Sequence, residues 1–359
     1  MSAYEEWLAA LREAGEQVRA ACPAGVPVDE AEGLRYVTRL ATTALWMFVE
    51  HADPLWPTLY QNSDEHKKFG LDNPDNVYLR CALDGRESYR LSGWRGEAPY
   101  LGLTIGADFY GGKGARQGTL AQHHLEEFEI AADGRFELFL SPERRPGNWI
   151  RLEPEATGMI LRQTFLDRAR QRPAELRIQR LGAEGPPPPL APEAVEAGLR
   201  RAAGFVLGTT RLFLRMADVW AKQPNQLVGA SGASTRQLHG DPDLFYCSGF
   251  WKLAPDEALV VEVRPAQRAL LWSFQLANRW LESLDYRWRP VATNSGKAVL
   301  RPDGSATLVV AERDPGVPNW LDSAGHAEGT MCFRWLLAEQ DPPLPTLRVV
   351  KLAELGGRA

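Results

Sequence analysis

The sequence predicts an α+β fold made of two tandem antiparallel β-sandwich modules, jelly-roll-like, each preceded by helices and related by internal duplication. The first observation is a motif, Glu-Arg-x-Pro-Gly followed by Asn-Trp and an aliphatic residue, which occurs at 143–150 and again at 312–321. The second is an Asp-Gly turn before an alternating strand in each half. The third is a long helical pattern ahead of each half. A repeat at this separation indicates two similar modules rather than one long fold.

Apolar residues recur at helical spacing in three stretches, which predicts helices over about 4–21, 28–52 and 192–222. Short segments punctuated by Gly, Pro and Asp-Gly predict many short strands, and this favours antiparallel sandwiches over a parallel sheet.

A Gly- and Pro-rich segment at 183–191 is typical of a semi-rigid linker. We therefore expect a first domain over 1–182, with the N-terminal helices and the first sandwich. A second domain over 192–359 would hold a helix, the second sandwich and the predicted pocket.

The two copies also match outside the motif. Asp133-Gly134 corresponds to Asp303-Gly304, each placed where a tight turn needs a positive backbone angle. Arg162 corresponds to Arg334, and Asn73-Pro74-Asp75 with Tyr78 corresponds to Asp241-Pro242-Asp243 with Tyr246. Several unrelated residue types therefore recur in the same order in both halves.

The copies diverge at titratable positions. When Asn148 is aligned with Asn319, Arg151 lies opposite Asp322 and Glu155 lies opposite His326. We interpret the retained residues as structural, and the changed polar residues as positions where one copy could have acquired chemistry.

Composition narrows the classes of protein and partner. The formal net charge of −5 and the lack of a basic run interleaved with aromatics exclude a nucleic-acid-binding surface. The most apolar helical run, 202–219, carries Arg211 and Arg215 in its middle, so we expect no membrane span.

The cysteines stand singly, which is typical of free thiols in a reducing compartment, and the N-terminus lacks a secretory pattern. We expect a cytoplasmic protein and leave homo-oligomer formation open.

No motif for a cofactor is present. The chain lacks a strand–GxGxxG–helix unit, a Walker-type loop, a Gly-x-Ser-x-Gly elbow and a His-Glu-x-x-His pair. We therefore expect no cofactor.

Three segments carry a resemblance to a known family: Asp72-Asn73-Pro74-Asp75-Asn76-x-Tyr78, the stretch 314–326, and Arg334-Trp335. They resemble a bacterial family known as domain of unknown function 1214, most densely in the C-terminal half. The resemblance implies mostly β-sandwich proteins without an assigned reaction, and it implies no catalytic set.

The sharpest candidate for chemistry is Asp322 with His326. Four residues apart in a Gly-containing loop, the carboxylate could orient the imidazole as in acid–base pairs. Arg334 could stabilise a developing anion nearby. The alternative is structural: Asp322 caps the turn after Trp320, and His326 hydrogen-bonds the backbone.

A second cluster has the composition of a ligand pocket. Alternation places Asn278, Trp280 and Glu282 on one strand face, with Tyr286 close by and Trp320 as a further wall. The alternative is an exposed strand end with ordinary sheet pairing.

Two pairs of carboxylates, Asp72 with Asp75 and Asp241 with Asp243, could suggest a divalent cation. Asx-Pro-Asp is more often a turn, and the repeat places it at equivalent corners, so we predict no metal site.

Together these observations predict a cofactor-independent enzyme that acts on a small, largely apolar metabolite by acid–base chemistry in the C-terminal module. Its catalytic residues would be Asp322, His326 and Arg334. The alternative is a non-catalytic small-molecule-binding or accessory protein that uses the same pocket.

Overall fold

The computed structural model describes residues 1–23, 25–108, 118–230, 232–266, 268–338 and 342–355. The predicted helices are confirmed: α1 spans Ala3–Ala21, α2 spans Pro27–Leu45 and α3 spans Pro192–Ala221. Ser2 begins α1 with a reciprocal capping box to Glu5, and proline begins both α2 and α3, where a missing N–H costs nothing. A π-helical turn η1, Trp46–Glu50, extends α2, and a short helix α4, Gly232–Gln237, precedes the last strands.

The strands of the first half form two antiparallel-dominated sheets that pack face to face around one apolar core. One sheet has the order β1-β7-β3-β4 and the other the order β6-β5-β2-β8, with β5 and β6 parallel. The strands are β1 Asn76–Ala82, β2 Tyr89–Trp94, β3 Tyr100–Ala107, β4 Gly118–His124, β5 Arg135–Ser141, β6 Trp149–Arg151, β7 Gly158–Thr164 and β8 Glu175–Arg180, with the 3-10 turn η2 at Leu125–Glu127.

The second half also packs two sheets around one core, in the orders β13-β12-β16-β10-β9 and β15-β14-β11-β17. Here β14 and β15 are the parallel pair. The strands are β9 Gln226–Gly229, β10 Leu244–Lys252, β11 Glu257–Val263, β12 Leu271–Ala277, β13 Ala292–Asn294, β14 Ala306–Ala311, β15 Trp320–Asp322, β16 Glu328–Leu336 and β17 Thr346–Lys351, followed by the 3-10 turn η3 at Leu352–Glu354.

The predicted α+β class is therefore confirmed, with a sheet-rich chain and few helices among the described residues. The predicted turns also have the expected backbone, because Gly134 and Gly304 have φ of 84° and 80°. Glycine reaches such angles without the steric cost that other residues incur.

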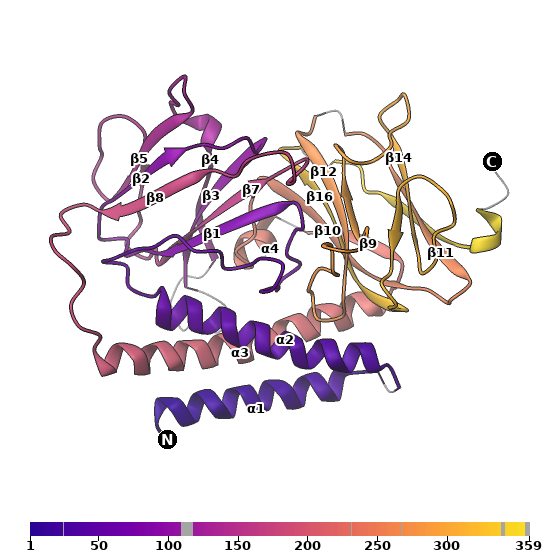
Figure 1. The fold of residues 1–359 in the computed structure, drawn as a ribbon, viewed down its shortest axis with the longest axis horizontal. Coiled ribbons are helices and arrows are strands. Elements are labelled where there is room, and N and C mark those ends of the chain that lie inside the picture. The colour runs from indigo at the N-terminus through magenta and orange to yellow at the C-terminus, as the bar shows by residue number, and fades with distance from the viewer. Residues whose placement is uncertain (24, 109–117, 231, 267, 339–341, 356–359) are drawn as a thin grey trace.

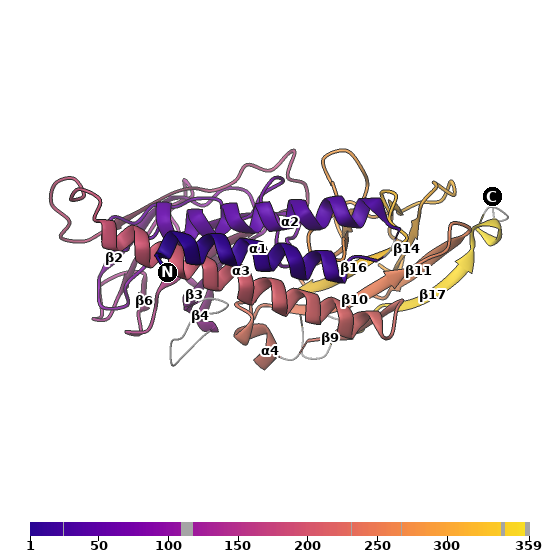
Figure 2. The same cartoon turned by 90° about the horizontal axis from the view of Figure 1, so that it is seen from below.

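The helices form one layer that lies along both halves (Figure 1). Viewed from below, α1, α2 and α3 run side by side beneath the sheets (Figure 2). Their shared core includes Ile160 from the first half and Trp280 and Cys332 from the second. The helical layer therefore joins the two halves. Within the described ranges, no helix combines the length and the apolarity needed to cross a bilayer.

Candidate functional site

A cavity of about 360 Å³ lies between the two halves, where α3 of the helical layer forms part of its wall. Its wall comes from β1 and β7 of the first half, β10 and β16 of the second half, α3, α4 and the loop before β1. Pockets for small molecules commonly begin at about 300 Å³. The volume is therefore sufficient for a small organic ligand.

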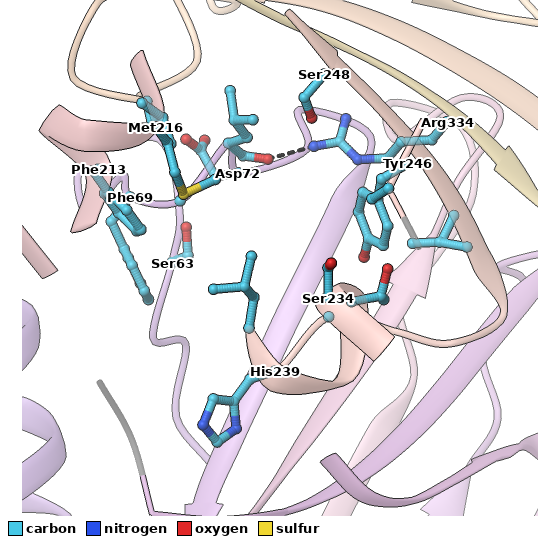
Figure 3. A pocket seen from close by; sticks show the side chains of 18 of the residues that line it. Ser63, Phe69, Asp72, Phe213, Met216, Ser234, His239, Tyr246, Ser248 and Arg334 are labelled. Atoms are coloured by element: carbon cyan, nitrogen blue, oxygen red, sulfur yellow. Dashed lines mark hydrogen bonds between the residues drawn. The ribbon is translucent and has the colours of Figure 1, made fainter. Parts of the chain in front are cut away.

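The large apolar side chains gather on one side of the cavity, where Ser63 and Asp72 also lie. Figure 3 shows Phe69, Phe213 and Met216 together on one side, facing Tyr246 and Arg334 on the other. Phe213 and Met216 lie on α3, whose other face packs against α1, and Phe69 belongs to the loop before β1. Burying an apolar group against these side chains would remove hydrocarbon surface from water, which is favourable at about 25 cal/mol per Å².

Two buried arginines, Arg162 on β7 and Arg334 on β16, also line the cavity and are exposed by only 8% and 3%. Each donates a hydrogen bond across the boundary between the halves: Arg162 Nη2 to the carbonyl of His239 at 2.7 Å, and Arg334 Nη2 to the carbonyl of Leu71.

Each arginine also donates from Nη1 to a side chain of its own sheet. Arg162 donates to Thr104 Oγ1 at 2.5 Å, and Arg334 donates to Gln275 Oε1 at 2.6 Å. The two guanidinium groups are thus held in matching positions.

The acceptor carbonyls sit at equivalent, unusual backbone positions. Leu71 and His239 have φ of 57° and 56°, the left-handed region that non-glycine residues seldom adopt. Two residues later, Asn73 Oδ1 accepts from Asp75 N, and Asp241 Oδ1 accepts from Asp243 N, both at 3.0 Å. The Asx-Pro-Asp segments are therefore turns, as the sequence predicts, and they aim one carbonyl at the arginine of the other half.

A tyrosine accompanies each arginine. Tyr78 is the cross-strand neighbour of Arg162, and Tyr246 is that of Arg334. Their hydroxyl oxygens accept the N–H of Asn73 at 2.9 Å and of Asp241 at 3.2 Å. Burial raises the pKa of both phenols, so each remains neutral and keeps its O–H as a donor.

His239 also lines the cavity, and it is buried. Burial and the nearby charges of Arg80 and Arg162 lower its pKa to about 3. The imidazole is therefore neutral at physiological pH, and the arginines carry the positive charge of this part of the cavity wall.

The two residues of the predicted acid–base pair, Asp322 and His326, each contact other groups. Asp322 accepts from Arg289 Nη1 at 2.6 Å and from the backbone N–H of Ala324 at 2.7 Å. His326 contacts Glu32 Oε2 through Nε2 at 2.9 Å, and its Nδ1 lies 3.1 Å from the Ser323 carbonyl. Arg334 is the member of the predicted trio that lines the cavity.

His326 and Glu32 shift each other's pKa. Burial alone would lower the pKa of His326 and raise that of Glu32. The hydrogen bond and the charge attraction between them outweigh burial, so the pKa of His326 is raised and that of Glu32 is lowered. Both shifts favour the ion pair at neutral pH.

The predicted ligand cluster joins the second half to α2. Asn278 Nδ2 donates to Glu32 at 2.9 Å and to Glu282 at 3.1 Å, and Glu282 pairs with Arg39 at 3.1 Å. Trp280 is 1% exposed and stacks on Tyr36, with ring centroids 6.3 Å apart. The predicted strand face is wrong: β12 ends at Ala277, and the chain turns back at 278–282, where Leu281 has a φ of 60° and Asn278 N donates to the Glu282 carbonyl at 2.9 Å. The turn still brings these side chains together, but they form a packed contact outside the cavity wall.

The other two predicted ligand residues lie elsewhere. Tyr286 has Lys68 Nζ over its ring at 4.5 Å, and Trp320 donates from Nε1 to the Ala311 carbonyl at 3.1 Å. Neither lines the cavity.

The buried carboxyl of Glu282 has a testable effect on stability. Burial raises its pKa from 4.5 to about 7, so between these pH values the native protein holds a proton that the unfolded chain has lost. The stability of the native protein falls as pH rises through this range because the unfolded chain binds fewer protons.

A Glu282→Gln variant lacks this titration. We expect the difference in free energy of unfolding, variant minus wild type, to increase by up to about 3 kcal/mol between pH 4.5 and 7.5, because only wild type loses stability through the titration of Glu282. Urea midpoints at the two pH values measure the difference, with the half-exposed Glu137→Gln as control. A difference that does not change with pH would contradict the prediction.

The sequence prediction missed Arg162, Tyr78, Tyr246 and His239 as members of one site. The signal was present, because Arg162 matches Arg334 and Tyr78 matches Tyr246 in the repeat. Retained residues were interpreted as structural, yet they line the cavity where the two halves meet.

Comparison with known proteins places the chain in a family. A crystal structure of an uncharacterized protein from Burkholderia cenocepacia superposes with a TM-score of 0.93 at 42% sequence identity, covering 98% of this chain and 97% of the other. The chain belongs to the family of this Burkholderia protein. The VPA0106 protein from Vibrio parahaemolyticus has a TM-score of 0.51 at 14% identity, over 88% of this chain and 98% of the other, which shows a similar fold alone. No family model and no curated protein matches the chain.

Proposed function

We propose that this protein binds a small, largely apolar molecule in the cavity between its two halves. The observation that carries the proposal is the composition of the wall: apolar side chains from α3 and the loop before β1 face a small set of convergent polar groups from both sheets. An apolar wall with a few fixed polar groups is the usual composition of a small-molecule site.

Unpartnered polar atoms in the wall support the proposal. Asn62 Oδ1, Ser63 Oγ and Asn76 Oδ1 are buried and have no hydrogen-bond partner within the described part of the chain. A buried polar atom without a partner costs about 1–3 kcal/mol. A ligand or water in the cavity would remove that cost.

The geometry supports binding better than the acid–base enzyme predicted from the sequence. Both ring nitrogens of His326 already have partners, and neither Asp322 nor His326 lines the cavity. A substrate in the cavity would meet Arg334 from the predicted trio, together with Arg162 and the two tyrosines.

The test is a ligand screen by thermal shift, with one variant that fills the cavity. At a ligand concentration of 100 times Kd, binding to the native state stabilises it by about 2.7 kcal/mol. Met216→Trp should abolish the stabilisation because the indole occupies ligand volume.

Val219→Trp is the matched control, since it adds the same side chain to an exposed position on the same helix. It should respond to ligand as wild type does. If every stabilising compound acts equally on Met216→Trp and wild type, the cavity is not the binding site.

We also propose that the halves arose by duplication of one jelly-roll-like module, and that the chain is related to domain of unknown function 1214. The matching strand orders support duplication. So do the Asn-Trp turns: Asn148 Nδ2 donates to the carbonyls of Glu129 and Glu137, and Asn319 Nδ2 donates to those of Val299 and Thr307. The Asp72-to-Tyr78 and Asp314-to-His326 segments carry the family resemblance.

A further inference from the structure

Resting on the proposed binding function, we infer that the ligand carries a carboxylate, and that Arg162, Arg334, Tyr78 and Tyr246 bind it. These four residues line the cavity, the charge of each arginine acts on both phenols, and the four are called the cationic cradle. Its partner is therefore a small acid with an apolar body.

Neither arginine of the cradle has an oppositely charged group in direct contact among the described residues. Neither Arg162 nor Arg334 has a carboxylate within 4.0 Å among the described residues, since neither takes part in a salt bridge there. Their hydrogen-bond acceptors among the described residues are neutral: two backbone carbonyls, a hydroxyl and an amide. Burying a charge without an opposite charge is costly, so an anion placed between the two guanidinium groups is strongly favoured.

Two carboxylates whose charge acts on the arginines, Asp241 on Arg162 and the cavity-lining Asp72 on Arg334, already have hydrogen-bond partners. Asp72 accepts from Ser283 N at 2.9 Å and from Ser283 Oγ at 2.7 Å. Asp241 accepts from the Tyr100 hydroxyl at 2.8 Å, and burial raises its pKa although the charge of Arg162 acts to lower it. Neither one neutralises an arginine by direct contact.

The arginines and tyrosines of the cradle have more hydrogen-bond donors than the described residues use. Arg162 and Arg334 each donate two hydrogen bonds to described residues, and a guanidinium has five N–H donors. Tyr78 and Tyr246 accept from backbone N–H groups, and no acceptor for their own O–H is found among the described residues. Two cations and two phenols therefore face the cavity with donor capacity to spare.

A carboxylate matches this set. It is acceptor-only and has about four lone-pair sites on two oxygens, one for each member of the cradle. Hydrogen bonds to a charged acceptor are about twice as strong as neutral ones. The apolar wall of Phe69, Phe213 and Met216 on the facing side would receive the hydrocarbon body.

The test uses probes that share one body and differ only in the head group: 3-phenylpropanoate, 3-phenylpropanol, 3-phenylpropylamine and 3-phenylpropyl phosphate. Isothermal titration calorimetry with the full chain measures each Kd. We expect the carboxylate to bind at least about tenfold more tightly than the alcohol, and the amine not to bind.

Two tyrosine variants locate the head group without removing a buried charge. Tyr78→Phe and Tyr246→Phe should each weaken carboxylate binding by about 3- to 10-fold. Tyr89→Phe is the matched control, because Tyr89 also accepts a backbone N–H, from Asp84 at 2.8 Å, but lies outside the cavity. It should leave carboxylate binding unchanged.

Arg334→Gln should weaken binding more, by about 30-fold or more, because a charge-assisted bond is lost. If that variant does not fold, the tyrosine variants still decide the question.

The outcomes separate this inference from the proposed function. If the alcohol binds as tightly as the carboxylate and Met216→Trp blocks both, the cavity binds ligands but the carboxylate inference is wrong. A lower Kd for 3-phenylpropyl phosphate than for 3-phenylpropanoate also overturns the carboxylate inference. If none of the four probes binds wild type, both the inference and the proposed function are contradicted for ligands with a phenylpropyl group.

Discussion

Trp280→Ala is expected to lower the free energy of unfolding by about 3–5 kcal/mol, the usual cost of truncating a buried tryptophan. The indole is 1% exposed, stacks on Tyr36 and donates from Nε1 to the Asp29 carbonyl at 3.1 Å. A Cβ on Gly33 would lie 2.8 Å from the same ring, so α2 approaches closely enough to leave no spare space. Removal of the ring would leave a cavity between α2 and the second half.

Urea denaturation measures the loss, and Trp288→Ala is the control because that side chain is 80% exposed. The control should change stability by no more than about 0.5 kcal/mol. A loss below about 1 kcal/mol for Trp280→Ala would mean that this contact does not hold α2 to the second half.

Asp72→Ala is expected to cost about 2–4 kcal/mol and to weaken ligand binding at the same time. Its carboxylate accepts from the N–H and the hydroxyl of Ser283, and bonds to charged acceptors contribute about 1.5–3 kcal/mol each. The preceding residue, Leu71, supplies the carbonyl that Arg334 contacts. Losing the Asp72 anchor therefore loosens one side of the cationic cradle.

Thermal unfolding without ligand, and calorimetry with 3-phenylpropanoate, measure the two effects separately. The control is Asp218→Ala, whose carboxylate is 61% exposed in its 3.4 Å pair with Arg279 and should contribute less than about 1 kcal/mol. Unchanged stability with Asp72→Ala would contradict the anchoring role.

The fold class and the main helices could be predicted because their signals are local. Helical spacing, a proline at the first turn and an Asp-Gly at a turn act over a few residues. The pairing of strands into sheets could not be read in the same way. For example, β1 and β2 follow each other along the chain, with Asp84-Gly85 between them, yet they belong to different sheets.

The site was predicted less well, for two physical reasons. The partner of His326 is Glu32, which lies 294 residues away in the sequence, so the nearby Asp322 was the natural candidate. Closeness in sequence does not decide which carboxylate an imidazole contacts once helices from the other end of the chain pack beside it.

The second reason concerns the repeat. Retained pairs such as Tyr78 with Tyr246 were interpreted as structural because they recur at equivalent positions. When two similar halves face each other, equivalent residues near the boundary are brought together, and the reciprocal contacts of Arg162 with His239 and of Arg334 with Leu71 illustrate this. The residues kept in both copies of the repeat therefore include residues that line the cavity.

The most direct measurement is a crystal structure of the protein grown with 3-phenylpropanoate at saturating concentration. The account predicts the carboxylate between Arg162 and Arg334, within hydrogen-bond distance of Tyr78 or Tyr246, and the phenyl ring against Phe213 and Met216. An acid bound instead beside His326 and Glu32, or a cavity that stays free of the acid under these conditions, would contradict it.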